Sequence, residues 1–314
     1  MSVLSAPRFN DEHAAYAWVE AKLWPDGPVC PHCGATDRIK PLSGKSTRIG
    51  VRKCYHCYKP FTVKVGTIFE DSHVPMYKWL QAFHLMCSSK KGISSNQLHR
   101  ILEVSLKTAW FMSHRLREAM RDGGFAPLGG SGVPVEADET FIGRKEGVPV
   151  PKGGYSHKHA VLALVERGGK VRSVHLDRLT KAEVGKVVRE NVTREAWLFT
   201  DESRLYREVG AEFAGHSRVH HALGEYVDPD DATINTQTVE GYFSIFKRGM
   251  KGVYQHCAEK HLHRYLAEFD FRYNNRVRMG IDDAARAERA LLGVTGKRLT
   301  YRQPRVRPAV SVGT

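Results

Sequence analysis

The chain lacks the long apolar runs and the apolar leader that mark membrane and secreted proteins. No apolar segment in its 314 residues approaches the roughly 20 residues that a membrane-spanning helix needs. The first residues carry charge early and have no apolar core, so they do not resemble a secretion signal. Internal repeats and low-complexity stretches are absent as well. We therefore expect a globular protein of the cytoplasm.

Acidic residues are fewer than basic residues in this sequence. Only 34 Asp and Glu stand against 48 Lys and Arg, which gives a formal charge of +14 and a pI of about 9.5. This excess favours a polyanionic partner, of which nucleic acid is the commonest. A basic protein without such a partner is the alternative. The sequence has no glycine loop of the Walker type, so nothing in it indicates a nucleoside triphosphate as cofactor.

Cysteine is sparse, but four of the six cysteines form two pairs. Each pair has the spacing C-x-x-C, and twenty residues separate the pairs. One C-x-x-C turn brings two sulfurs to an ion, and a second turn completes a tetrahedral site. We expect one structural Zn²⁺, held by Cys30, Cys33, Cys54 and Cys57. His32 and His56 lie inside the turns and are alternative ligands.

Residues 1–70 are assigned to an N-terminal helix and this zinc ribbon. Short strands are expected at Ser46–Lys53 and Lys59–Val65, with turns at Gly34 and Gly66. A closed Cys₄ site has no open coordination position, so its role is to fold a module too small for a core of its own. The basic side chains of the ribbon suit contact with DNA, although a ribbon that docks on protein would look similar.

Residues 71–126 have the pattern of a helix-turn-helix. Ser94 or Ser95 can cap a helix Asn96–Leu102, and after a short turn a second helix is expected over Leu106–Arg121. The basic residues of the second helix are Lys107, His114, Arg115, Arg117 and Arg121. We interpret them as DNA contacts. A helical bundle that links two domains is the alternative.

Residues 133–292 form the largest unit, which we expect to be a catalytic domain. Its first strand, Val133–Ile142, places Glu136, Asp138 and Thr140 on one face. An acidic residue in the middle of a strand is unfavourable by propensity. A metal site explains Asp138 better than an exposed edge strand does.

Two more acids follow at structurally distinctive positions. Asp201 comes at the end of an apolar strand, where open α/β sheets place their ligands. Glu240 lies on a helix that Thr236 or Thr238 can cap, and Lys247 stands two turns further along nearly the same face. Between these acids and Asp138 the sequence predicts strands His159–Glu166 and Lys170–Leu176 and a helix opening at Thr180.

This order of elements is that of the ribonuclease-H-like fold, an α/β fold with a mixed sheet and flanking helices. In that fold three acids converge although they are distant in sequence. Each acid alone would fit an exposed surface equally well. The ordered trio on strand, strand and helix favours a catalytic site.

The sequence resembles the insertion-sequence transposases of the DDE superfamily, in the group with an N-terminal zinc ribbon. The matching stretches are CPHCG, CYHC, EADETFIGRK, FTDES, NTQTVEGYFSIFKRGMKGVYQHC and KHLHRYLAEFDFRYNNR. They extend from about Trp24 to Arg276. Carried over by position, Asp138, Asp201 and Glu240 are the DDE acids, and Lys247 is the lysine that follows the glutamate.

The resemblance implies an enzyme that binds the terminal repeats of its element, cleaves DNA and joins the freed 3′-hydroxyl to target DNA. Two Mg²⁺ (or Mn²⁺) ions can activate the attacking oxygen and stabilise the leaving one. By hypothesis Asp138 bridges both ions, and Asp201 and Glu240 hold one each. Lys247 is better suited to holding a DNA phosphate than to acting as a base. Transposition joins two ends, so a homodimer or larger assembly on double-stranded DNA, associated with a bacterial nucleoid, is expected.

Some features near or beyond the predicted site stay open. His220 and His221 lie near the acids and either act there or are surface histidines at a strand end. The helix His261–Asn275 is expected to pack behind the acids. The basic tail 293–314 is interpreted as a mobile arm that contacts phosphate, or as a solvated end.

Two other functions remain as alternatives. A transcription regulator would use the ribbon and the helix-turn-helix but leaves the three acids unexplained. A structure-specific nuclease would share the acids and would cut DNA without strand transfer.

Overall fold

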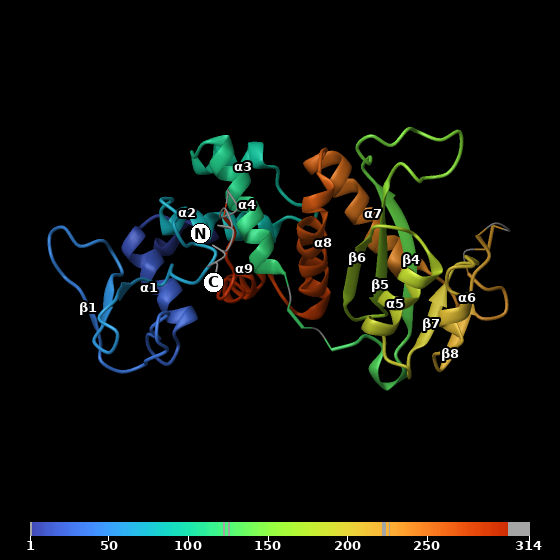
Figure 1. The fold of residues 1–314 in the computed structure, drawn as a ribbon, viewed down its shortest axis with the longest axis horizontal. Coiled ribbons are helices and arrows are strands. Elements are labelled where there is room, and N and C mark those ends of the chain that lie inside the picture. The colour runs from blue at the N-terminus through green and yellow to red at the C-terminus, as the bar shows by residue number, and fades with distance from the viewer. Residues whose placement is uncertain (1, 122, 125, 222–223, 226, 301–314) are drawn as a thin grey trace, which may run out of the picture.

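The computed structural model describes residues 2–300 apart from 122, 125, 222, 223 and 226. Figure 1 shows an elongated molecule with two parts, which we call the N-terminal lobe (residues 2–121 and 281–300) and the sheet lobe (residues 126–280). Among the described residues, no helix is both long enough and apolar enough to cross a membrane.

A small antiparallel sheet carries the paired cysteines. Its strands are β1 (Ile39–Pro41), β2 (Arg52–Cys54) and β3 (Pro60–Phe61). The strand expected over Ser46–Lys53 is mostly a loop. Gly50 turns the chain there with a φ of 73°, a conformation that glycine adopts without strain.

Five helices build the core of the N-terminal lobe. They are α1 (Glu12–Leu23), α2 (Met76–Ser88), α3 (Ser95–Leu102), α4 (Leu106–Met120) and α9 (Asp283–Leu292). Helices α3 and α4 are those predicted for the helix-turn-helix. Each starts at a serine cap, since the Ser94 hydroxyl accepts the Gln97 N–H and the Ser105 hydroxyl accepts the Thr108 N–H.

The basic side chains of α4 are mostly buried, so the expectation that they contact DNA is wrong for three of them. His114 and Arg117 are each 1% exposed and Arg115 is 5% exposed. Arg115 donates to two backbone carbonyls at 2.8 Å, which fixes a loop rather than a phosphate. Only Lys107 and Arg121, at the two ends of the helix, are exposed. A helical spacing of basic residues does not reveal that the helix is enclosed by a second lobe.

A five-stranded mixed sheet is the centre of the sheet lobe. Its strands are β4 (Val135–Ile142), β5 (His159–Glu166), β6 (Val171–Leu176), β7 (Trp197–Thr200) and β8 (Gly215–Arg218). Their order is β6-β5-β4-β7-β8. Strand β4 is antiparallel to β5 and parallel to β7, and β7 is parallel to β8. This is the ribonuclease-H-like arrangement, so the predicted fold class is confirmed.

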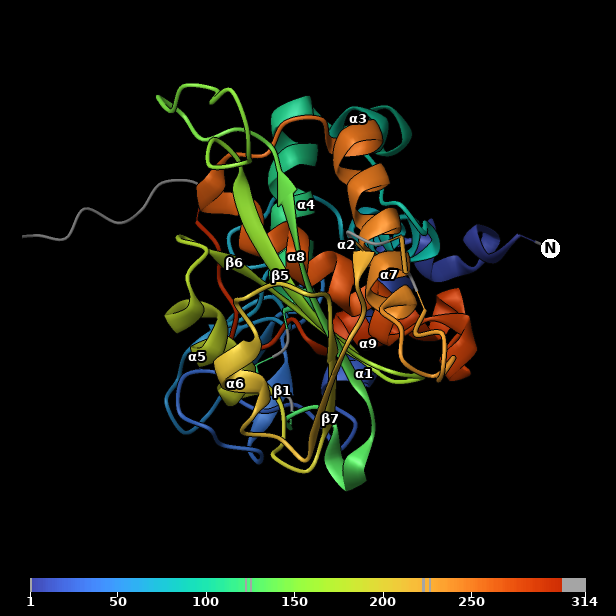
Figure 2. The same cartoon turned by 90° about the vertical axis from the view of Figure 1, so that its right-hand side faces the viewer.

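Helices cover both faces of this sheet (Figure 2). They are α5 (Lys181–Asn191), α6 (Arg207–Gly210), α7 (Gln237–Gly249) and α8 (Glu259–Asn274). Val135 and Ala137 of β4 pack with α5 and α6, and Val161 and Ala163 of β5 pack with α7 and α8. Single helical turns complete the chain: η1 (Val3–Ser5), η2 (Pro7–Phe9), η3 (Gly130–Gly132), η5 (Met250–Tyr254) and η6 (Val277–Met279).

The C-terminal helix α9 returns to the N-terminal lobe. Leu291 of α9 and Val294 beyond it are buried in the core that α2 and α4 build, although α9 lies in the segment 133–292 assigned to the catalytic unit. Thr295 pairs with Thr67. The start of the tail is therefore packed on the lobe and is not the mobile arm that we expected, while residues 301–314 lie outside the described residues.

One buried carboxylate joins the two lobes. Glu268 of α8 is fully buried, and its Oε2 accepts a hydrogen bond of 2.7 Å from Arg117 Nε of α4. Arg272 and the Tyr254 hydroxyl donate to the other oxygen. Burial alone would raise the pKa of Glu268, but Arg272 and Arg117 outweigh it and hold that pKa below its ordinary value. The carboxylate is therefore charged, and the stability of this buried charge depends on the groups that pair with it.

Arg117→Ala should lower the free energy of unfolding by about 3 kcal/mol, because it removes one partner of a buried charge. Denaturant-induced unfolding measures the change. Arg121→Ala is the matched control, since this exposed arginine directly follows the same helix and its loss should leave stability nearly unchanged. Equal stability of the two variants would show that Glu268 does not need the arginine.

Candidate active site and metal clusters

The four paired cysteines meet in the N-terminal lobe. The Sγ atoms of Cys30 and Cys57 are 3.7 Å apart, as are those of Cys33 and Cys54. Ligands that bind one zinc at about 2.3 Å stand about 3.8 Å apart along the edge of a tetrahedron. The sulfurs therefore fit a structural Zn²⁺, as the spacing of the pairs predicted.

The histidines inside the two turns do not join this cluster. Among the described residues, the group of convergent ligands here consists of the four cysteines alone. The Nε2 atom of His56 instead lies 2.8 Å from Asp37 Oδ1. His32 is exposed. The interpretation of His32 and His56 as alternative ligands is therefore wrong.

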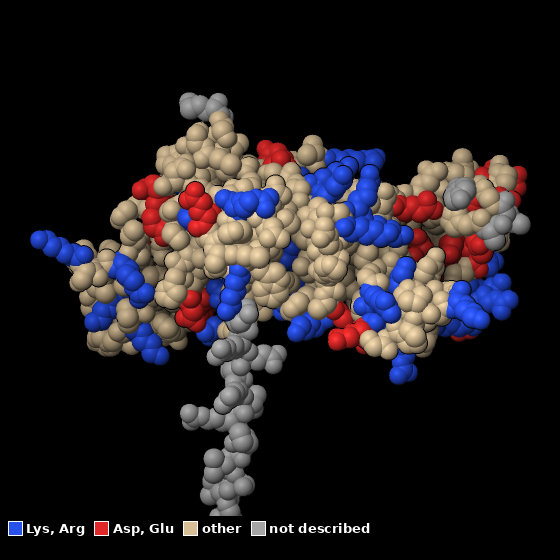
Figure 3. Space-filling view, turned by 90° about the horizontal axis from the view of Figure 1, so that it is seen from above, with Lys and Arg blue, Asp and Glu red and all other residues tan. Residues whose placement is uncertain are grey.

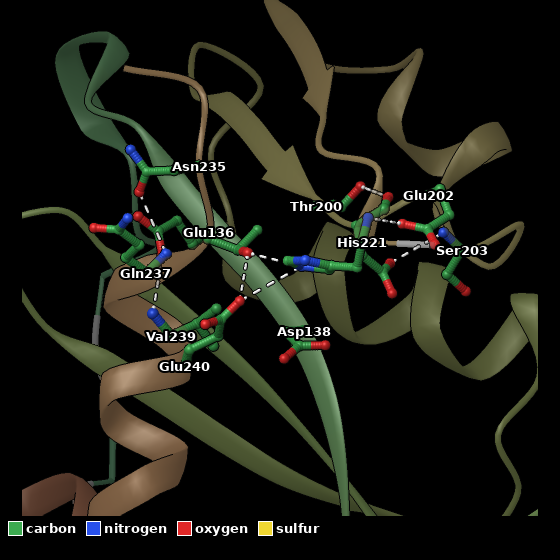
Figure 4. A network of polar contacts seen from close by, with 12 residues as sticks. Glu136, Asp138, Thr200, Glu202, Ser203, His221, Asn235, Gln237, Val239 and Glu240 are labelled. Carbon is green, nitrogen blue, oxygen red and sulfur yellow. Dashed lines mark hydrogen bonds and ion pairs between the residues drawn. The ribbon is translucent and has the colours of Figure 1, made fainter. Parts of the chain in front are cut away.

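Asp138 stands in the middle of β4, on the face that meets α7 (Figure 4). Its Oδ1 accepts the Glu139 N–H at 2.7 Å. Burial first, and then the charges of Glu139, Asp201 and Glu240, raise the pKa of Asp138 from its ordinary 3.8 to about 7. All three acids expected from the sequence are therefore close enough for their charges to interact at Asp138.

Asp201 follows β7 directly, at the strand end where the sequence placed it. In the parallel pair of β4 and β7, Glu136 lies opposite Phe199, so Asp138 and Asp201 each follow this last paired position by two residues. Asp201 Oδ1 accepts the Ser203 N–H at 3.0 Å. Burial is the main cause that raises the pKa of Asp201, and the charge of Glu202 adds to it.

Glu240 lies in the first turn of α7 and is positioned by two neighbours. Its Oε1 accepts the Thr236 hydroxyl at 3.1 Å and lies 3.5 Å from His221 Nε2. Thr236 precedes the helix, but its hydroxyl makes no capping bond. The backbone N–H of His221 in turn donates to Glu202 at 2.9 Å. His221 thus links the loop after β8 to the helix that carries Glu240 (Figure 4), whereas His220 is exposed.

A buried ion pair fixes the start of α7. Glu136 is fully buried, and Arg167 Nε donates to its Oε1 at 2.6 Å. The other oxygen of Glu136 accepts the Val239 N–H, 2.9 Å away, at the positive end of α7. Arg167 also donates to the carbonyls of Thr233 and Asn235, which precede the helix. The pair therefore holds the turn that carries Glu240 against β4.

Glu139 is a further carboxylate at the site that the sequence analysis missed. It accepts the Tyr206 hydroxyl at 2.5 Å. Burial raises the pKa of Glu139, and the charge of Asp201 adds to this, while the bond from Tyr206 acts against it. Strand alternation places Glu139 on the face opposite Asp138, and only the fold reveals that both lie near Asp201.

Lys247 is half-buried in the last turn of α7. Its Nζ lies 5.9 Å from the centre of the Phe243 ring. Seven residues along a helix correspond to about 10 Å, so Lys247 is two turns away from Glu240 along the same side. It lies beside the acids rather than among them.

The acids fit a divalent cation by their chemistry. Among the described residues, the ligand atoms of two groups lie within 4.8 Å of one another: the four cysteines, and the set His159, His175 and Glu259. The three acids are spaced more widely than either group. Carboxylate oxygens are the hard ligands that Mg²⁺ and Mn²⁺ prefer. Burial and then the repulsion between carboxylates raise the pKa of Asp138, and a cation nearby would offset both effects.

Comparisons with known proteins find two transposase domains in the sequence. Residues 127–274 match the family model described as the ISXO2-like transposase domain, and residues 10–59 match the transposase zinc-ribbon domain. A relative from Halobacterium salinarum, named as an uncharacterized protein in transposable element ISH50, is 27% identical over 281 residues. The alignment covers 84% of this chain and 91% of the relative.

Asp138→Asn should stabilise the protein in magnesium-free buffer near neutral pH, by about 1–3 kcal/mol. The folded-state pKa of about 7 lies above the ordinary value of 3.8, so the folded chain binds this proton more tightly than the unfolded chain. Stability therefore falls as the pH rises through this window, and the asparagine avoids that loss.

The measurement is denaturant unfolding of both proteins at several pH values between 4 and 8. The advantage of the variant should grow with pH. Asp177→Asn changes a side chain that is 89% exposed and should give no such trend. A variant that loses stability relative to wild type as the pH rises would mean that the Asp138 carboxylate is stabilised as an anion.

Proposed function

This chain belongs to the ISXO2-like transposases, and on that premise we propose that it is the DNA transposase of an insertion sequence. It binds the terminal repeats of the element and catalyses metal-dependent DNA strand cleavage and strand transfer. The proposal rests on the convergence of three acids, since Asp201 at the end of β7 and Glu240 on α7 both lie near enough to Asp138 on β4 for their charges to act on it. Asp138, Asp201 and Glu240 are the proposed catalytic residues.

The three acids are the proposed ligands of two Mg²⁺ or Mn²⁺ ions. When bound, such ions activate the attacking oxygen and stabilise the leaving oxygen of an in-line displacement at phosphorus. Asp138 is the central ligand of the three because the charges of Asp201 and Glu240 both act on it. A structural Zn²⁺ in the Cys₄ cluster keeps the N-terminal ribbon folded.

Two groups of residues hold Glu240 in place for this role. The buried pair of Glu136 and Arg167 fastens the start of α7 to the sheet. Thr236 and His221 face the Glu240 carboxylate itself. We therefore assign His221 as a positioning residue, which orients Glu240 through the contact of its Nε2 atom.

Double-stranded DNA, as transposon ends and as target, is the proposed partner. Figure 3 shows Lys and Arg side chains gathered near the middle of one face, beside acidic side chains toward the end that carries β7 and β8. Phosphate contacts by such side chains supply affinity that does not depend on sequence. Because two ends must be joined, we propose a homodimer or larger assembly, working at the nucleoid in the bacterial cytoplasm.

The test is a joining assay with supercoiled DNA that bears the ends of the element. Wild type with Mg²⁺ should cut at the ends and join them to target DNA. Asp138→Asn should bind the same DNA but lose at least about a thousandfold in both steps, because metal ions contribute several kcal/mol to the barrier. Asp177→Asn, on an exposed turn, is the matched control and should remain active.

The outcomes separate the proposal from its alternatives. Cutting without joining by wild type would indicate a nuclease. Binding without any metal-dependent cutting would indicate a transcription regulator. Joining that survives in Asp138→Asn would mean that the assigned acids are not the catalytic ones.

Lys247→Ala should weaken DNA binding and reduce the slope of log affinity against log salt by about 1, as expected when one phosphate contact is lost. Fluorescence anisotropy of labelled end DNA across a salt series measures both quantities. Lys186→Ala on α5, where the side chain is 72% exposed, is the control. An unchanged slope combined with lost cleavage would place Lys247 in the chemical step instead.

A further inference from the structure

A second cluster of metal-ligand side chains lies away from the acids. His159 is the first residue of β5, His175 lies in β6, and Glu259 is the first residue of α8. His175 is paired with Val161 across the two strands. Since alternate residues of a strand share a face, His159 and His175 are on the same face of the sheet. This is the face that α8 covers.

Both histidines have a buried nitrogen without a hydrogen-bond partner. His159 is only 3% exposed, yet its Nδ1 has no such partner, and the same is true of His175 Nε2. These two atoms face one carboxylate oxygen, since Glu259 Oε1 is 3.5 Å from His159 Nδ1 and 3.7 Å from His175 Nε2. Hydrogen bonds between nitrogen and oxygen are usually about 2.9 Å long, so both distances are too long for good ones.

The distances fit an ion between the three atoms. Imidazole nitrogens and carboxylate oxygens bind Zn²⁺ at about 2.0–2.1 Å, which sets neighbouring ligands about 3.3–3.4 Å apart in a tetrahedron. The observed 3.5 and 3.7 Å are close to this value. All three ligand atoms lie within 4.8 Å of one another. A small shift of the Glu259 side chain, which is 52% exposed, would complete the geometry.

We propose that His159, His175 and Glu259 bind a transition-metal ion of the Zn²⁺ type. Two imidazoles and one carboxylate make a ligand set that suits zinc and its neighbours rather than Mg²⁺. Because Glu259 is partly exposed, the fourth coordination position of the ion is left to water. The ion fastens the first residue of α8 to β5 and β6, and thereby fixes one end of the helix whose other residues contact α4.

The site is distinct from the group of acids. Asp138 is paired with Ala163 of β5, and His159 lies four residues before Ala163 in the strand. Four residues of a strand span about 13 Å, too far for an ion to be shared. The proposal therefore goes beyond the proposed function and does not depend on it.

The test is the zinc content of the full-length protein. It is loaded with zinc, dialysed in excess Mg²⁺ so that the acids are occupied, and measured by atomic emission spectroscopy. Wild type should retain two zinc ions per chain, one in the Cys₄ cluster and one in the new site. Glu259→Gln and His175→Gln should each retain one.

Matched controls change the same residue types outside the cluster. His263→Gln alters an exposed histidine of the same helix, and Glu190→Gln alters a glutamate of α5 that is 59% exposed. Both should retain two ions. Because Glu259 is at the surface, its variant should fold even if a histidine variant does not.

Cobalt substitution separates the two sites. Co²⁺ bound by cysteine gives intense thiolate charge-transfer absorption, whereas Co²⁺ bound by histidine and glutamate gives only weak ligand-field bands. The second equivalent of Co²⁺ should therefore add only weak bands, and Glu259→Gln should remove them. A wild type that binds a single equivalent, or a Glu259→Gln variant that still binds two, would overturn the proposal and leave the cluster as a histidine–carboxylate ion pair.

Discussion

The arrangement of the two lobes depends on one buried carboxylate, Glu268. A charge without access to water must be paired, and losing a partner is far more costly than losing a surface ion pair. One partner, Arg117, belongs to α4 of the N-terminal lobe, so α4 has to dock against α8 of the sheet lobe. Another, Tyr254, belongs to the turn that follows α7. Gly92 of the N-terminal lobe leaves room for this tyrosine, because a Cβ at that position would collide with its hydroxyl. The helix that carries Glu240 is therefore connected through Tyr254 to the same point that joins the lobes.

Four carboxylates of the sheet lobe form two kinds according to their neighbours. Glu136 and Glu268 are completely buried, and each is met by an arginine and by further N–H or O–H donors. Asp138 and Asp201 instead lie near other carboxylates, and the pKa of each is raised, first by burial and then by those negative charges. Paired charges of the first kind hold elements together. Crowded like charges of the second kind reduce stability, and such perturbed groups gather where a site binds a charged ligand. The register of β4 and β7, together with the ion pair of Glu136, keeps the crowded acids near one another despite their repulsion.

Local patterns in the sequence were enough to predict much of this fold. The C-x-x-C spacing predicted the sulfur cluster, and alternation predicted β4 to within two residues. The predicted strands His159–Glu166 and Lys170–Leu176 match β5 and β6 to within one residue. Contacts between distant segments were not predictable in this way. Helix α9 lies in the segment assigned to the catalytic unit, but it packs in the core of the N-terminal lobe. Likewise, fifteen residues separate His159 from His175, and Glu259 is much further along the chain, so the cluster forms only when β5, β6 and α8 come together.

The composition shows that the chain is positively charged, but only the fold shows which basic side chains reach the surface. Arg115, Arg117, Arg272 and Arg286 are all buried, so none of them is available to a polyanion. Arg286 of α9 donates to the carbonyls of Cys87 and Asn275, near the ends of α2 and α8, where the helix dipoles leave partial negative charge. The planar guanidinium has five N–H donors and can bind several carbonyls at once, which an ammonium group does less well. In this protein arginine therefore serves in part as an internal connector between helices. The residues proposed to contact DNA have to be sought among the lysines and arginines that reach the surface, and half-buried Lys247, on the side of α7 that carries Glu240, is one candidate.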